Sequence, residues 1–354
     1  MAVDLKKEIG YKEIKEFNLH DLEMVRIILR GGSVLDWQRL NITSEKEAYE
    51  LLKVNEIDPN DPFDIEYVEA VKQEAIDYLK TVFNFPVPYK IRNASIVELL
   101  LIASKKRGHH QLCACIVLKV MHIIHHYRGR EARKLLPLSD NELFRLVEMK
   151  VYREVGKLLA LQSPVLEFMG SRKEHYSLYT KIMAKENDIA IQLYDKLRFR
   201  IITATVDDIF PVLNFLVRNL FPFHYVIPSE SINTLLRFKT FCENHPPLNK
   251  LITKLQLDIE LEDQLLPNVD NKFSHPSYKA IHFVVDIPIK ISKLVDDVYG
   301  DVAYIEEPVT FAVTEFQILD KKSDIENEKG EACHKKYKER QKKEVERRLL
   351  LGKI

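Results

Sequence analysis

The spacing of the apolar residues changes near Pro164, and this change does most to limit the folds that are open to the chain. Up to about Gln162, apolar residues recur with the 3.6-residue period of amphipathic helices. Beyond Pro164, β-branched stretches that alternate in polarity are interleaved with helical ones. We therefore predict an α+β protein, with a mostly helical domain over residues 1–163 and a second domain over residues 164–354, built on a mixed sheet flanked by helices.

Helix start signals and periodicity locate the individual elements. Ser44 with Glu47, and Ser139 with Glu142, have the spacing of capping boxes. The tail from Glu331 holds nine Lys and Arg against four Glu, which predicts an exposed basic helix. The remaining patterns predict helices over residues 21–30, 65–83, 95–107, 139–161, 173–185 and 206–220 and from residue 324, and strands over residues 196–205, 280–287 and 309–319.

The composition limits the partners and the location of the protein. The formal net charge is zero, so the overall charge favours neither nucleic acid nor a membrane surface. The four cysteines lack the spacing of a zinc site and the density of a disulfide scaffold, which fits a reducing compartment. No apolar run approaches the roughly 20 residues that span a bilayer. We expect a cytoplasmic protein without a membrane partner, and we leave open whether it forms a homo-oligomer.

The chain offers side chains, instead of a glycine-rich loop, for binding phosphates. Neither GxxxxGK[ST] nor GxGxxG occurs in the sequence. Lys173, Ser177 and Lys181 follow one another at intervals of four residues, so that on a helix they would form one stripe of two ammonium groups around a hydroxyl. Such a stripe could bind a polyphosphate. A solvated helix face is the alternative.

Two acidic residues lie on elements that could meet. Asp195 precedes the predicted strand over residues 196–205, and Glu315 shares one face of another predicted strand with Val313 and Gln317. If these strands are neighbours, the two carboxylates could share a Mg²⁺ ion, which takes a few carboxylate oxygens and completes its shell with substrate phosphates. Ordinary acids at strand ends are the alternative.

Aromatic and imidazole side chains mark two further segments. Tyr278 and His282 lie just before and inside a predicted strand, where a tyrosine could stack on a base or pack in the core. His122 and His126 lie four residues apart on a predicted helix. They could bind a metal, but no acid lies at a suitable spacing beside them, so packing or phosphate contact is the preferred interpretation.

Five segments, in matching order, resemble the synthetase domain of the RelA/SpoT family, the enzymes that make (p)ppGpp. They read SRKEHYSLYTK, DKLRFR, RFKT, PSYKAIH and EFQIL, and the last is followed by a helix with Ala332, His334, Tyr337 and Lys338 at matching positions. The resemblance covers about residues 168–338 and includes an insertion near residues 243–272. It implies a nucleotidyltransferase-like fold for the second domain.

The resemblance also implies an activity: the Mg²⁺-dependent transfer of pyrophosphate from ATP to the 3'-hydroxyl of a guanosine nucleotide, GDP or GTP. By the same resemblance, the ATP phosphates would be bound by Lys173, Ser177, Lys181, Arg200 and Arg172, the last displaced by one residue from the family's position. Asp195 and Glu315 would hold the Mg²⁺ and Glu315 would activate the hydroxyl. The acceptor would be contacted by Tyr278, His282, Gln317 and Lys239.

Two other functions stay open at this point. Some members of the family pyrophosphorylate the 3' end of tRNA, and the chain could do the same. Alternatively, the protein could be a nucleotide-binding regulator without turnover, because Ser171, Thr240 and Leu319 replace charged residues of the family pattern.

Overall fold

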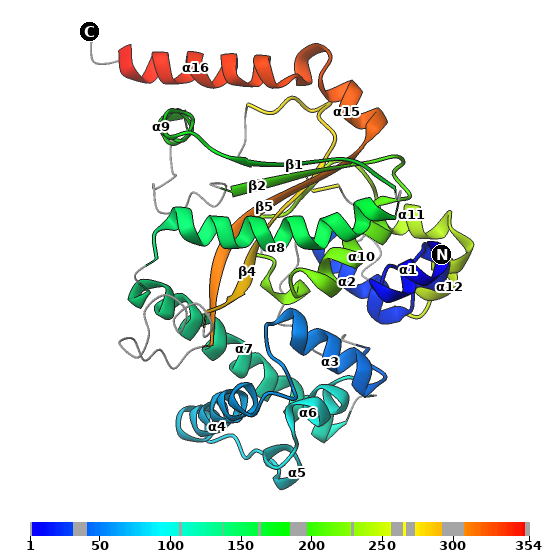
Figure 1. The fold of residues 1–354 in the computed structure, drawn as a ribbon, viewed down its shortest axis with the longest axis vertical. Coiled ribbons are helices and arrows are strands. Elements are labelled where there is room, and N and C mark those ends of the chain that lie inside the picture. The colour runs from blue at the N-terminus through cyan, green and yellow to red at the C-terminus, as the bar shows by residue number, and fades with distance from the viewer. Residues whose placement is uncertain are drawn as a thin grey trace.

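The computed structural model describes residues 2–30, 41–105, 108–136, 138–161, 164–184, 197–227, 230–255, 265–266, 273–291 and 308–350. Within these residues, the chain forms helices first and then a five-stranded sheet with further helices, which confirms the predicted α+β class. Figure 1 shows α3 to α6 below the sheet and α9, α15 and α16 above it.

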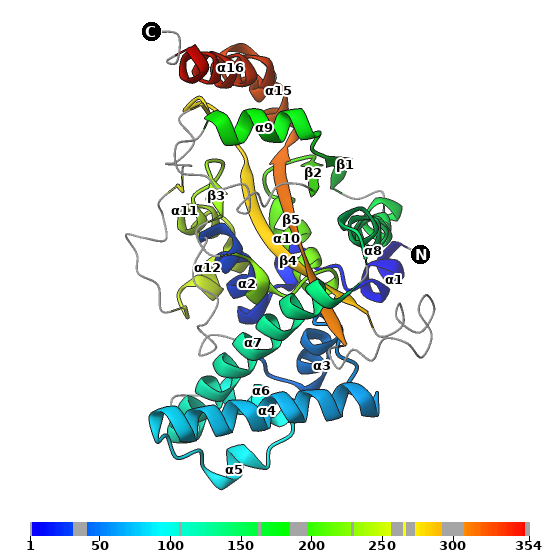
Figure 2. The ribbon, with the colours of Figure 1, turned by 90° about the vertical axis from the view of Figure 1, so that its left-hand side faces the viewer.

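The sheet has the strand order β1-β2-β5-β4-β3. Strands β2 and β5 are parallel, and every other neighbouring pair is antiparallel. The longest strands, β4 and β5, lie side by side in the middle of the sheet, and Figure 2 shows them between α16 at the top and α4 at the bottom. The strands are β1 (Val165–Arg172), β2 (Leu197–Thr203), β3 (Ile232–Asn233), β4 (Ile281–Lys290) and β5 (Val309–Asp320).

Six of the predicted helices are confirmed, with shifts of up to four residues at their ends. The single helix predicted from residue 324 is instead two helices, α15 and α16, with the 3₁₀ turn η6 (Gly330–Ala332) between them. Ser139 forms a complete capping box with Glu142. Of the capping box predicted for Ser44, only the hydrogen bond from the Glu47 amide to the Ser44 side chain is present, because the Glu47 carboxylate accepts from the Thr43 amide instead.

The helices of the first half are α1 (Ala2–Glu8), α2 (Leu19–Arg30), α3 (Glu45–Val54), α4 (Pro62–Phe83), α5 (Tyr89–Arg92), α6 (Ile96–Ala103), α7 (His109–Leu135) and α8 (Asp140–Ala160). Those of the second half are α9 (His175–Ala184), α10 (Ile209–Asn219), α11 (Phe238–Glu243), α12 (Pro246–Ile252), α15 (Lys321–Asn327) and α16 (His334–Leu350), with a 3₁₀ turn, η4 (Phe223–Tyr225), after α10.

One face of the sheet is aromatic and buried. Phe199, Phe283 and Phe316 come from three neighbouring strands, and the rings of Phe283 and Phe316 stack with their centroids 5.4 Å apart. Phe221, which follows α10, packs on both of these rings. Tyr152 of α8 covers Phe199 at the other end of the row. Helices α8 and α10 therefore cover this face, and polar side chains are left to the opposite one.

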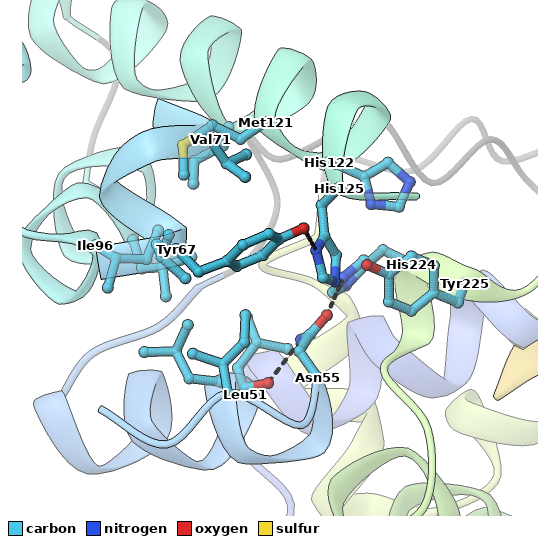
Figure 3. A pocket seen from close by; sticks show the side chains of 15 residues that line it. Leu51, Asn55, Tyr67, Val71, Ile96, Met121, His122, His125, His224 and Tyr225 are labelled. Atoms are coloured by element: carbon cyan, nitrogen blue, oxygen red, sulfur yellow. Dashed lines mark hydrogen bonds between the residues drawn. The ribbon is translucent and has the colours of Figure 1, made fainter. Parts of the chain in front are cut away.

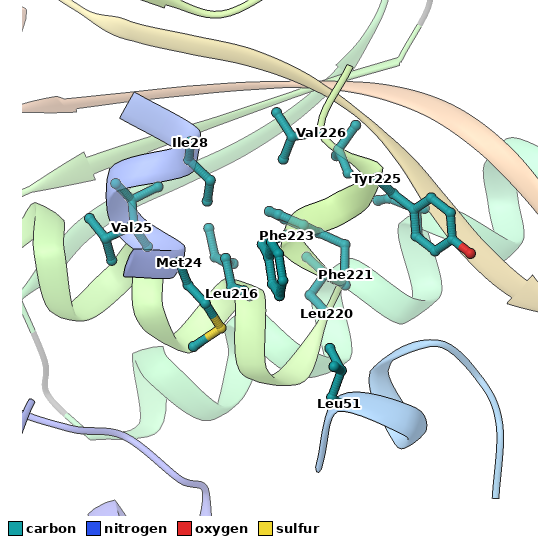
Figure 4. Packing of buried hydrophobic residues seen from close by; sticks show 14 of the residues in the cluster. Met24, Val25, Ile28, Leu51, Leu216, Leu220, Phe221, Phe223, Tyr225 and Val226 are labelled. Carbon is teal, nitrogen blue, oxygen red and sulfur yellow. The ribbon is translucent and has the colours of Figure 1, made fainter. Parts of the chain in front are cut away.

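The hydrophobic core is continuous across the predicted boundary at residues 163 and 164. Met24, Val25 and Ile28 of α2 pack beside Leu216 and Phe223, as Figure 4 shows, so that helices of both halves share one core. Helix α7 reaches the sheet directly, because the ring of Phe311 lies against Gly129, which has no side chain. The division into domains over residues 1–163 and 164–354 stays a prediction. None of the helices described here combines the length and the apolar character needed to span a bilayer.

Candidate active site

Three neighbouring strands bring polar residues together on the face of the sheet opposite the aromatic core. Strand β5 lies between β2 and β4, and Cα register pairs Arg198 with Glu315 and Arg200 with Gln317 across β2 and β5. On the other side of β5, His282 pairs with Gln317. Because partners in register point to the same face, these five side chains form one group, called here the Glu315 cluster.

Glu315 is the buried acid at the centre of the Glu315 cluster, with 8% of its surface exposed. Its Oε1 accepts a hydrogen bond from His282 Nδ1 at 3.1 Å and its Oε2 accepts one from Arg198 Nε at 3.2 Å. Burial alone would raise the pKa of Glu315, but the hydrogen bond from His282 and the charges of Arg198 and Lys173 outweigh it and hold the pKa well below its usual value. The carboxylate is therefore ionised at neutral pH.

Tyr278 joins the cluster through Gln317. The Gln317 Nε2 donates to the Tyr278 hydroxyl and lies 3.2 Å from His282 Nε2, while the tyrosine and imidazole ring centroids are 5.9 Å apart. Burial raises the pKa of Tyr278 to about 12, against the charges of Arg200 and Arg198, so the phenol is neutral. The half-buried ring stands immediately before β4, at the edge of the cluster.

The predicted cationic stripe is only partly helical. Helix α9 begins at His175, so Ser177 and Lys181 lie on it while Lys173 precedes it. The reason is that strand β1 extends to Arg172, which pairs with Leu197, and leaves no residues for an earlier helix start. Lys173 nevertheless lies close enough to Glu315 to affect its pKa. The prediction that all three form one helical stripe was wrong for Lys173.

Arg172 and Arg200 differ in their surroundings. Arg172 binds Glu148 of α8 through Nε at 2.8 Å and Nη2 at 2.6 Å, and its guanidinium lies 5.8 Å from the ring of Phe144. It therefore faces the helical side of the sheet, away from Glu315. Arg200 is on the Glu315 side, where its Nη2 donates to Asp324 Oδ1 at 2.6 Å. The structure brings Arg200 into the cluster and leaves Arg172 outside it.

Two further predicted site residues are not placed in the cluster. Lys239 lies on α11, and its Nζ is 3.6 Å from Glu243 on the same helix. Asp195 lies outside the described residues, so the predicted meeting of Asp195 with Glu315 stays a prediction.

Metal-binding chemistry in the cluster depends on Glu315. Among the described residues, no group of three or more His, Cys, Asp or Glu side chains is arranged to hold a metal ion. A Mg²⁺ ion, however, needs only one or two protein carboxylates when substrate phosphates supply its other ligands. Glu315 is an ionised carboxylate of the right kind, so the cluster fits a magnesium ion that arrives with a nucleotide.

Two histidines on α7 pack against each other. The rings of His122 and His126 stack with centroids 5.9 Å apart. His126 Nε2 also lies 2.6 Å from Asp286 Oδ2 of β4, an acid 160 positions further along the chain. The sequence analysis did not identify Asp286 as a partner of His126, and it did not identify Arg198 as a partner of Glu315. The alternation in LRFRI is the signal that could have placed Arg198 on the same strand face as Arg200.

Comparison with solved structures finds proteins that align with part of this chain. Small alarmone synthetase 1 from Bacillus subtilis is 18% identical over 59% of this chain and 87% of that chain, with a TM-score of 0.31. The same synthetase bound to its product pppGpp is 16% identical over 62% of this chain and 91% of that chain, with a TM-score of 0.30. A GTP pyrophosphokinase family protein from Streptococcus pneumoniae is 15% identical over 59% of this chain and 84% of that chain, with a TM-score of 0.28. These similarities assign no activity to the chain and no role to any residue. No protein-family model and no curated protein sequence matches the chain.

Proposed function

We propose that this protein is a Mg²⁺-dependent nucleotide pyrophosphokinase, which transfers pyrophosphate from ATP to the 3'-hydroxyl of GDP or GTP and makes (p)ppGpp. The observation that carries the proposal is the Glu315 cluster, in which a buried, ionised carboxylate contacts Arg198 and His282 and adjoins Gln317 and Tyr278. Residues of three separate sequence motifs that resemble the RelA/SpoT synthetases meet in this cluster.

The cationic side chains around the cluster would bind the ATP phosphates. Phosphoryl-type transfer depends mainly on positioning and on neutralising the charge of the phosphate oxygens. Without a glycine-rich loop in the sequence, this task falls to the cations Lys173, Lys181 and Arg200, together with the hydroxyl of Ser177. Because Arg172 is bound to Glu148 on the other side of the sheet, the proposal no longer includes it among the ATP ligands.

Glu315 would have two roles in the reaction: it would bind Mg²⁺, and it would accept a proton. In the arrangement described, its pKa is well below the usual value, which suits a metal ligand better than a proton acceptor. A nucleotide phosphate that drew Arg198 away would remove one of the two contacts that weaken Glu315 as a base. Glu315 could then accept the proton of the ribose 3'-hydroxyl as its oxygen bonds to the β-phosphorus and AMP leaves. Magnesium, when bound by Glu315 and Asp195, would neutralise phosphate charge.

Tyr278 and its neighbours would bind the acceptor nucleotide. The ring of Tyr278 is held by the hydrogen bond from Gln317 and is neutral at physiological pH, so its face could stack on a guanine base. His282, Gln317 and Lys239 would contact the rest of the acceptor.

The proposal is tested with ATP labelled at the γ-phosphate. Purified protein, Mg²⁺ and labelled ATP are incubated with GDP, GTP or tRNA, and the products are separated. We expect label in a guanosine tetra- or pentaphosphate and release of AMP. Label at the 3' end of tRNA would keep the chemistry and replace the acceptor. Nucleotide binding without AMP release would identify a regulator without turnover.

A further inference from the structure

A cavity of about 70 Å³ lies among helices α3, α4, α6 and α7 and the turn η4 (Figure 3). None of its lining residues belongs to the Glu315 cluster. Most of the lining is aliphatic, and the polar side chains come from α4, α7, η4 and Asn55, the residue that follows α3. The side chains on which the argument rests are Val71, Asn55, Tyr67, His122, His125 and His224.

The polar side of the cavity is ordered by hydrogen bonds. The Tyr67 hydroxyl and His125 Nδ1 are 2.9 Å apart, and His224 Nε2 is 3.0 Å from Asn55 Oδ1. Asn55 in turn donates to the Leu51 carbonyl at 2.7 Å. Figure 3 shows the Tyr67 ring reaching across from α4 toward the histidines. These contacts fix the side chains without a ligand, so the polar side is preformed.

The lining carries no charge at neutral pH. Burial lowers the pKa of His122 to about 3 and that of His125 to about 4, and it holds the pKa of His224 well below its usual value. Among the described residues, no Asp, Glu, Lys or Arg lines the cavity. Because a charged group is costly to bury without a partner, the lining favours an uncharged ligand.

A buried ring nitrogen of His125 is available for a further hydrogen bond. Nε2 of His125 is buried and has no hydrogen-bond partner in the part of the chain that the structure describes. Its other ring nitrogen is already occupied by Tyr67. A buried polar atom without a partner is costly, so a ligand that carried a hydroxyl or a ring NH could satisfy His125.

We propose that this cavity is a binding site for a small, uncharged molecule that has an apolar ring or chain and one hydrogen-bonding group, which pairs with His125. One water-sized group needs about 10–15 Å³ of such space, so the cavity holds a ligand of about five to seven non-hydrogen atoms. Phenol has this size and chemistry, and toluene has the same shape without the hydroxyl.

Binding in the cavity would also reach the strand that carries His282. The residues after His224 join β4: Val226 forms a bridge with Val285, and the Ile227 amide donates to the Val284 carbonyl at 2.8 Å. A ligand in the cavity therefore lies beside His224, whose neighbours along the chain bond to β4 two residues from His282. This regulatory consequence rests on the proposed function, whereas the binding site itself does not.

The binding site is tested by titrating the full-length protein with phenol and with toluene in a calorimeter at neutral pH. We expect one saturable site for each, with phenol bound about threefold to tenfold more tightly because of the added hydrogen bond. Val71→Phe fills the cavity, so binding of both should weaken at least tenfold while the circular dichroism spectrum is kept. His125→Phe should make the two affinities equal. Val71→Leu is the milder filling variant should Val71→Phe fail to fold.

Three results would overturn the proposal: no saturable binding to the folded parent protein, unchanged affinity in the folded filling variant, or equal affinity of the parent for phenol and toluene. The regulatory consequence has a separate measurement, the rate of pyrophosphate transfer with and without saturating phenol. A rate that changes in the parent and not in the filling variant supports it. An unchanged rate removes the regulatory consequence and leaves the binding site, and a protein without transferase activity also leaves the calorimetric result intact.

Discussion

Arg198 and Glu315 face each other in register on the parallel strands β2 and β5, and Arg198 Nε donates to Glu315 Oε2 at 3.2 Å although 117 positions separate them. Parallel neighbours require a long crossover connection between them. Here that connection includes β3 and β4, and β4 returns to the other side of β5 with His282. The path of the chain therefore places both partners of Glu315 beside it.

The ion pair between Arg198 and Glu315 should contribute to stability. Arg198→Ala leaves a buried carboxylate with one partner fewer, and we expect a loss of roughly 1–3 kcal/mol in the free energy of unfolding. The matched control is Arg172→Ala, which removes the more exposed pair with Glu148 and should cost less than about 1 kcal/mol. Urea denaturation of the two variants measures both values. Equal losses would show that the burial of Glu315 does not strengthen its pair.

The two adjacent cations Arg172 and Lys173 should differ in their effect on ATP. The charge of Lys173 lowers the pKa of Glu315, whereas Arg172 faces α8 and binds Glu148 there. Lys173→Ala should raise the KM for ATP or lower kcat/KM by about tenfold or more, because a phosphate contact made in the transition state is lost. Arg172→Ala should leave both within about twofold of the parent values. Steady-state kinetics of both variants measure these effects. A large effect of Arg172→Ala with a small effect of Lys173→Ala would contradict the choice of Lys173 as the ATP ligand.

Gly129 on α7 is required for the contact between that helix and β5. A Cβ at this position would lie 2.4 Å from Phe311 Cε2 and 2.9 Å from the Val309 carbonyl oxygen. Gly129→Ala should therefore destabilise the protein by roughly 1–3 kcal/mol through overpacking. Gly156→Ala on α8 is the control, because nothing lies within 4 Å of its added Cβ. It should be neutral or stabilising by up to about 1 kcal/mol. Thermal and urea unfolding measure the difference, and a stable Gly129→Ala protein would mean that α7 is not held as described.

Acid should weaken the fold through the buried histidines. In the unfolded chain, imidazoles have pKa values near 6.5, whereas in the folded protein His122 titrates near 3 and His125 near 4. The unfolded state therefore binds more protons below pH 6.5, and stability is lost as the pH falls from 6.5 toward 4. Each imidazole should contribute roughly 1 kcal/mol per pH unit in that window.

The test is urea denaturation of the parent and of His122→Leu at several pH values between 7.5 and 4.5. The free energy of unfolding of the variant should fall less steeply with decreasing pH, because unfolding of the variant takes up about one proton fewer. Identical slopes would mean that His122 is not buried in its neutral form.

The elements with strong periodicity could be predicted from the sequence. The stretch over residues 309–319 became β5 (Val309–Asp320), and its alternation correctly placed Glu315 and Gln317 on one face. Strand β1 (Val165–Arg172) was missed, because it is an edge strand with most residues exposed and has no clear alternation. Its pairing with β2 also shortened the predicted helix over residues 173–185 at its start.

The contacts between elements could not be predicted, because they depend on strand order. The sequence indicated that His282 and Glu315 lie on strands, but only the order β2-β5-β4 makes them neighbours. The same holds for Asp286, which reaches His126 from β4. Sequence resemblance indicated Arg172 for ATP, but Arg172 pairs in register with the buried Leu197 and binds Glu148. The pairing of Asp195 with Glu315 stays a prediction.

The most direct measurement compares pyrophosphate transfer by the parent protein and by Glu315→Gln, with Mg²⁺, γ-labelled ATP and GDP or GTP. The glutamine keeps the size of the side chain and removes its charge, so we expect a folded protein, checked by circular dichroism, whose rate of label transfer and AMP release falls at least a hundredfold. A Glu315→Gln protein that transfers label at the parent rate would contradict the central role of Glu315.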